Sequence, residues 1–207
     1  MRNFLLVPDK DSYFVTFFKQ IAHQSATHIS SGTSYQDALH ISKVLEIVDT
    51  YQVDFRGISA LTGIALVVIY AVGSGIWVNA SPGWYASLVR PPWQPPDFVF
   101  GLIWPYNFVV LGITAFRVSQ KLSKPLIATW LISFAISIIF ALLWAYQFYV
   151  PHNLKFSAIC LTITSVLTIP LLVIAYKVSW QIGALLTPYQ LWVITATTLA
   201  WGYAVKN

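Results

Sequence analysis

Long apolar blocks fill the chain from residue 57 almost to its C-terminal end. They cover residues 57–77, 98–116, 126–150, 156–176 and 182–205, and none of them contains Asp, Glu, Lys, Arg or His. Each block reaches the roughly 20 residues that a helix needs to cross about 30 Å of hydrocarbon. The pattern predicts an all-α fold in which residues 57–207 form a bundle of five transmembrane helices.

Residues 1–56 are more polar and predict a short, partly helical N-terminal extension that stays in water. Residues 11–24 carry their aromatic and aliphatic side chains on one side, as a helix would, and a loop rich in Ser and Thr follows. Ser34 and Asp37 then resemble a capping box, and apolar residues recur at helical spacing up to Val48. We therefore expect a second helix there, separate from the first transmembrane span.

The connector between the first two apolar blocks is rich in proline. Residues 81–96 contain five prolines, interleaved with Trp84, Tyr85 and Trp93. Because proline fixes φ and lacks a backbone donor, residues 91–96 are excluded from a helix interior or a central strand. The pattern predicts a stiff, extended lid over the mouth of the bundle, with its aromatic rings held in fixed directions.

Composition excludes a soluble globular domain. The chain is 57% hydrophobic and 9% charged with a mean hydropathy of +0.67, whereas soluble domains carry roughly 25% charged residues. A single cysteine, Cys160, excludes an internal disulfide framework. We expect an integral, multi-pass protein whose partner is the lipid bilayer rather than nucleic acid. Five Lys and Arg residues near the span ends on the N-terminal side, against three on the other, favour a cytoplasmic N-terminus.

Ionisable groups offer little catalytic chemistry. The spans lack the charged residue that an ion-coupled transporter keeps in its bundle. The histidines at positions 23, 28, 40 and 152 have no ligand spacing, so no metal site is expected. No Ser or Thr in the spans has a His or carboxylate nearby in sequence, so we assign no catalytic residues and favour a protein that is not an enzyme.

Aromatic side chains make up 16% of the chain. An interfacial belt explains Trp77, Trp84, Trp180 and Tyr203. Trp104 and Trp192 lie several residues inside their spans, and Phe108 shares a helix face with Trp104. Aromatic residues on one helix face either pack against a neighbouring helix or line a ligand pocket, and their spacing does not distinguish the two explanations. Small residues in the first span, such as Gly63 and Gly73, are compatible with a homodimer.

Three segments carry a family resemblance. They read GWYASLVRPPWQPPDFVFGLIW, LGITAF and LTPYQLWVITATTLAW, and they resemble the TspO/MBR family, the tryptophan-rich sensory and translocator proteins also called peripheral-type benzodiazepine receptors. The resemblance covers about residues 57–207 and leaves residues 1–56 as an extension. It implies a five-helix membrane protein, often dimeric, with a ligand pocket beneath the loop between helices one and two. The family's ligands are porphyrins and haem, and sterols for some members.

Positions that match the family motifs are the candidate ligand-binding residues. The pocket tryptophans of the second and fifth helices match Trp104 and Trp192, and that of helix three matches Trp144. The loop motif matches Trp84, Tyr85, Trp93 and Pro96. To these we add Phe108, from its helix face, and Arg90, the nearest cation for the propionates of a porphyrin.

The chain departs from the family at four positions. Alanine stands at positions 141 and 200, where relatives usually carry asparagine. Leu102 replaces a proline, and Cys160 replaces an acidic residue. The bundle therefore has fewer polar groups that could bind a ligand.

The combined prediction is a membrane receptor for hydrophobic tetrapyrroles, linked to stress or tetrapyrrole regulation. No cofactor is required, and porphyrin or haem is the expected ligand. No His or Met lies in the first, second or fifth spans, which favours aromatic stacking over iron coordination. Two alternatives stay open. One is light-dependent porphyrin degradation with an indole taking part, and the other is an adaptor that presents residues 1–56 to a membrane complex.

Overall fold

The computed structural model describes residues 33–78 and 80–207, and every regular element in them is a helix. The elements are α2 (Thr33–Val78), α3 (Pro82–Ser87), α4 (Asp97–Lys121), α5 (Lys124–Tyr149), α6 (Leu154–Val178) and α7 (Trp180–Lys206). The chain divides into two units, Met1–Gly57 and Ile58–Asn207. The helix expected at residues 11–24 lies outside the described residues.

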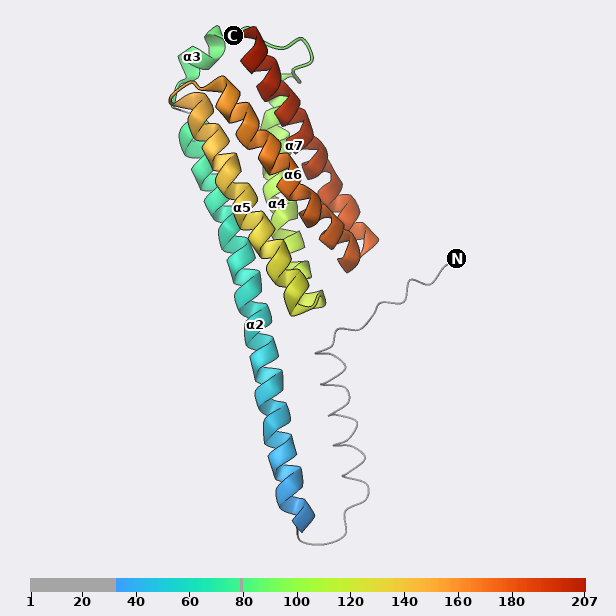
Figure 1. Ribbon diagram of the computed structural model, residues 1–207. Helices are drawn as coiled ribbons and strands as arrows, with labels where there is room; N and C mark the ends of the chain where they lie inside the picture. Colours follow the sequence, from blue (N-terminus) through green and yellow to red (C-terminus); the bar gives the residue numbers. More distant parts are fainter. Residues whose placement is uncertain (1–32, 79) are drawn as a thin grey trace, which may run out of the picture. The chain divides into compact units, whose positions relative to one another are not determined.

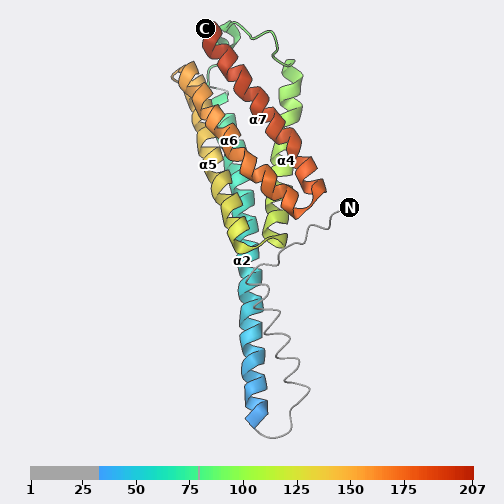
Figure 2. The same ribbon diagram turned by 45° about the vertical axis from the view of Figure 1, so that its right-hand side comes forward.

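Helices of the second unit form one bundle, which confirms the predicted all-α class (Figure 1). α4 packs against α7, α7 against α6 and α6 against α5. The part of α2 from Ile58 onward closes the ring, because Tyr70 contacts Trp104 of α4 and Trp77 contacts Tyr146 of α5. Figure 2 shows α6 and α7 side by side along most of their length, as in Figure 1. The ring order is therefore α2, α4, α7, α6, α5.

One boundary prediction was wrong. The helix expected from residue 34 and the span expected from residue 57 are a single helix, α2, of 46 residues. The physical reason is that residues 49–56 contain neither proline nor glycine, so nothing between the two segments interrupts the backbone hydrogen bonds.

Within residues 33–78 and 80–207, four helices are long and apolar enough to cross a membrane by length and composition. They are Ser42–Val78 within α2, together with α4, α5 and α6. α7 has 27 residues and completes the bundle, but Gln181, Gln190 and a set of threonines make it less apolar. The chain is therefore an integral membrane protein, and the side on which its N-terminus lies stays a prediction.

Glycines in α2 serve contacts within the chain. A Cβ on Gly63 would lie 2.6 Å from Cβ of Ala115 in α4, and a Cβ on Gly73 would lie 2.8 Å from Leu142 in α5. Gly63 and Gly73 therefore let α2 approach its own bundle. The dimer stays a prediction that nothing in the described residues tests.

Polar side chains join neighbouring helices inside the bundle. Trp201 Nε1 donates to Thr162 Oγ1 at 3.0 Å, and the Thr197 hydroxyl donates to the carbonyl of Leu161 at 3.2 Å, both between α7 and α6. Tyr106 donates to the carbonyl of Leu185 at 2.8 Å between α4 and α7. In hydrocarbon, hydrogen bonds of this kind are a main source of helix association.

Candidate ligand-binding cavity

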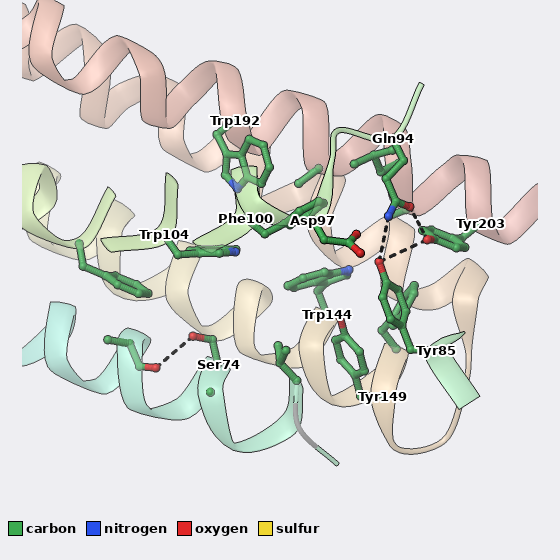
Figure 3. Close-up of a pocket in the computed structure, with 18 residues that line it drawn as sticks. Ser74, Tyr85, Gln94, Asp97, Phe100, Trp104, Trp144, Tyr149, Trp192 and Tyr203 are labelled. Atoms are coloured by element: carbon green, nitrogen blue, oxygen red, sulfur yellow. Dashed lines mark hydrogen bonds between the residues drawn. The ribbon is translucent and has the colours of Figure 1, made fainter. Parts of the chain in front are cut away.

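The second unit contains a cavity of about 430 Å³ between α2, α4, α5 and α7, beneath the segment 81–96 (Figure 3). This segment, the lid, contains α3 and an irregular stretch that leads into α4. As the prolines predicted, residues 91–96 are not helical. The lining residues are Ala71, Ser74, Gly75, Val78, Tyr85, Gln94, Asp97, Phe100, Trp104, Phe108, Trp144, Phe148, Tyr149, Trp192, Ala196, Leu199, Ala200 and Tyr203.

One wall is built by aromatic rings of α4. Trp104 and Phe108 are one helical turn apart and stack with centroids 5.7 Å apart and an interplanar angle of 26°. The edge of Tyr70 in α2 supports both, at 6.0 Å from Trp104 and 5.4 Å from Phe108. These contacts hold the two rings in place, and both line the cavity with apolar surface.

A second wall joins α4 to α7. Phe100 packs edge to face on Trp192 with centroids 5.2 Å apart. Trp192 is 7% exposed although it lines the cavity. Trp144 of α5 adds a third indole, and Figure 3 shows all three tryptophans bordering the same space.

Two of these indoles have buried donors without acceptors. Nε1 of Trp144 and Nε1 of Trp192 make no hydrogen bond in the described part of the chain. A buried donor left unsatisfied costs about 1–3 kcal/mol. Both nitrogens are buried, so the surface that these indoles turn to the cavity is apolar.

Three side chains join the lid to α7 through a closed set of hydrogen bonds (Figure 3). Gln94 Nε2 donates to the Tyr85 hydroxyl at 3.4 Å, and the Tyr203 hydroxyl donates to Gln94 Oε1. The hydroxyl oxygens of Tyr85 and Tyr203 are 3.3 Å apart. Because the Tyr203 proton is used on Gln94, the Tyr85 proton can complete the third contact, and each group then both donates and accepts.

The rest of the lid also rests on the end of α7. The Asn207 side chain accepts from the N–H of Val89 at 2.8 Å and donates to the carbonyl of Val89 at 3.3 Å. A Cβ on Gly202 would lie 2.8 Å from both Pro91 Cγ and Trp93 Cζ2. The absence of a side chain at position 202 is what allows the lid to lie against this helix.

Charge is sparse at the mouth. Asp97 is the only charged residue among the described residues that line the cavity. Its Oδ1 lies 3.5 Å from Nη1 of Arg90 in the lid. The described residues contain no group of three or more His, Cys, Asp or Glu that could hold a metal ion.

The structure brings five of the predicted site residues together and leaves four outside the cavity lining. Tyr85, Trp104, Phe108, Trp144 and Trp192 line it. The other four belong to the lid and take the following places. Trp84 stacks on His152 in the α5–α6 loop with centroids 3.8 Å apart, and Trp93 is 53% exposed above Gly202. Pro96 precedes the first residue of α4, and Arg90 reaches the cavity only through Asp97.

The four residues that depart from the family motifs lie in different environments. Ala200 lines the cavity, whereas Ala141 and Cys160 are buried elsewhere in the bundle. Leu102 is 68% exposed on α4.

Sequence reasoning missed several lining residues. Tyr203 was assigned to the interfacial belt but is 4% exposed and faces the lid. Phe100 lies one turn before Trp104, and that spacing could have identified it. Gln94 and Asp97 lie within the motif that carried the resemblance, but nothing in the sequence distinguishes them from solvated loop residues.

Comparison with known proteins matches the part of the chain that contains the cavity. The model of the TspO/MBR family matches residues 61–205, which include all the residues that line the cavity. The chain belongs to the TspO/MBR family. The match stops short of residues 1–60, so the N-terminal part of the chain is outside the family region.

Relatives come from bacteria and animals. The chain is 34% identical to the uncharacterised membrane protein YtaB of Bacillus subtilis over 140 residues, 65% of this chain and 88% of YtaB. It is 31% identical to protein CrtK of Rhodobacter capsulatus over 121 residues, 58% of this chain and 76% of CrtK. The translocator protein of Homo sapiens is 28% identical over 132 residues, 62% of this chain and 77% of that protein.

Proposed function

We propose that the protein is a membrane receptor that binds a flat, hydrophobic tetrapyrrole, a porphyrin or haem, in the cavity beneath the lid. The observation that carries the proposal is the cavity itself. Its volume of about 430 Å³ falls in the roughly 300–1,000 Å³ range of small-molecule sites. Membership of the TspO/MBR family supports a small-ligand site at this place. We further propose that occupancy of this site links the level of the ligand to stress or pigment regulation.

The chemistry of the walls fits such a ligand. A macrocycle can stack on the pair of Trp104 and Phe108, and a well-formed aromatic contact contributes about 0.5–1.5 kcal/mol beyond area burial.

Titration with protoporphyrin IX tests the proposal. Purified protein in detergent is titrated while tryptophan quenching and the porphyrin absorbance band are followed. In a Trp104→Leu, Trp192→Leu double variant the affinity should fall about tenfold to hundredfold, because two stacking surfaces are lost. The matched control is a Trp180→Leu variant, which removes an indole that is 70% exposed and does not line the cavity. Equal affinities for the wild type and the first variant would contradict the pocket.

A further inference from the structure

Asp97 places a single negative charge at the cavity. Asp97 is the only acidic residue among residues 57–207, which hold seven basic ones. It is the first residue of α4, and it lines the cavity at the end covered by the lid. A ligand that carries its own carboxylate at this end would therefore meet an anion of the protein.

Arg90 provides the cation that such a carboxylate would need. Its Nη1 lies 3.5 Å from Asp97 Oδ1, and the two side chains are 49% and 74% exposed. Exposed ion pairs stabilise a protein little, because water and salt screen them. Guanidinium groups bind carboxylates through two parallel hydrogen bonds, and only one contact joins this pair. Breaking it in favour of another carboxylate therefore costs little.

We infer that the Arg90–Asp97 ion pair is exchangeable and sets the affinity of the cavity for hydrophobic ligands with a carboxylate end. The ligand carboxylate replaces Asp97 on Arg90, and the macrocycle or other apolar body lies deeper, against Trp104 and Phe108. Arg90 is the residue that recognises the carboxylate. Asp97 is its competitor within the chain and lowers the affinity for anionic ligands relative to neutral ones of the same shape. The inference rests on the proposed function.

Two probes of one shape separate charge from stacking. Protoporphyrin IX has two carboxylates, and its dimethyl ester has the same macrocycle with none. The dissociation constants of both are measured for the wild type, Asp97→Asn, Arg90→Gln and the double variant. Arg117→Gln is the control, because it removes one positive charge from the other end of α4.

The expected results differ between the probes. Asp97→Asn should raise the affinity for protoporphyrin IX about threefold to tenfold, and Arg90→Gln should lower that affinity by a similar factor. The affinity for the dimethyl ester should change less than about twofold in every variant. The affinity for protoporphyrin IX should also change less than about twofold in Arg117→Gln. In the Arg90→Gln background, the gain from Asp97→Asn should largely disappear, because there is no cation left to compete for.

Three outcomes would overturn the inference. One is an equal response of acid and ester to Asp97→Asn and to Arg90→Gln. Another is an unchanged affinity for the acid in both variants. The third is an undiminished gain from Asp97→Asn without Arg90, which would mean simple repulsion rather than exchange. Failure of both probes to bind the wild type would instead contradict the proposed function.

Discussion

Gly202 illustrates how a single missing side chain positions the lid. A Cβ there would contact Pro91 and Trp93 at 2.8 Å, well inside van der Waals contact, and the proline ring has little freedom to move aside. A substitution must therefore lift the lid from α7 or bend the helix. Glycine in a helix interior costs about 0.5–1 kcal/mol relative to alanine, so this position sacrifices helix stability for the contact.

We predict that Gly202→Ala destabilises the protein by about 1–3 kcal/mol, the range for overpacking a tight contact. Gly112→Ala in α4 is the matched control, because nothing lies within 4 Å of a Cβ at that position. It should be neutral or stabilising by up to about 1 kcal/mol. The measurement is the thermal unfolding midpoint of each variant in detergent. A rise of the midpoint in both variants would show that the lid does not need glycine at position 202.

Site residues were predictable from the sequence where they lie deep inside a span, because depth distinguishes them from an interfacial aromatic belt. Trp104 and Trp192 lie too far from the span ends for an interfacial belt, and both line the cavity. Tyr203 lies close enough to a span end to fit the belt equally well. Only the fold shows that the lid covers it, since its partners Tyr85 and Gln94 are more than a hundred residues away in the chain.

The lid contributes Tyr85 and Gln94 to the cavity lining and is held to α7 by hydrogen bonds. Its hydrogen bonds to α7 converge on the Tyr203 hydroxyl, which contacts both Gln94 and Tyr85. Loss of this hydroxyl leaves the other two groups with one partner each. The backbone of the lid would then depend on Asn207 and on the packing above Gly202.

We predict that Tyr203→Phe loosens the lid and destabilises the protein by about 0.5–1.5 kcal/mol, as expected for a lost hydrogen bond. Tyr106→Phe removes a hydroxyl that joins α4 to α7 instead, so it controls for the loss of a hydrogen bond as such. Hydrogen exchange of peptides from residues 81–96 is the measurement. Exchange should quicken in Tyr203→Phe and not in Tyr106→Phe. Equal exchange rates in both variants would show that the lid is held in another way.

At the scale of elements, apolar length identified the spans but not the extent of α2. Each predicted span overlaps a helix of the bundle, because hydrocarbon imposes a minimum apolar length. The prediction of two separate helices, one ending near Val48 and one starting at residue 57, rests on a change in polarity alone. Polarity decides where a helix lies, whereas its ends depend on caps, glycine and proline, and none of these stops α2 before Val78.

The receptor hypothesis and the adaptor hypothesis assign the function to different parts of the chain. Every residue that lines the cavity belongs to Ile58–Asn207, and the TspO/MBR match also lies within that unit. Deleting residues 1–50 would leave residues 51–78 of α2, about 42 Å of helix at 1.5 Å per residue. That length still exceeds the roughly 30 Å of hydrocarbon that a span must cross.

We therefore predict that a chain without residues 1–50 keeps its ligand binding. Protoporphyrin IX at a free concentration of 100 times its dissociation constant should stabilise both the full and the shortened chain by about 2.7 kcal/mol, because it binds the folded state. Thermal unfolding with and without ligand measures this stabilisation. In the Trp104→Leu, Trp192→Leu variant it should fall to about 0.4–1.4 kcal/mol at the same ligand concentration, because the affinity is about tenfold to hundredfold lower. A shortened chain that folds but no longer responds to the ligand would mean that residues 1–50 contribute to binding. Loss of co-purifying membrane partners with the ligand response intact would instead assign these residues the role of an adaptor beside the receptor.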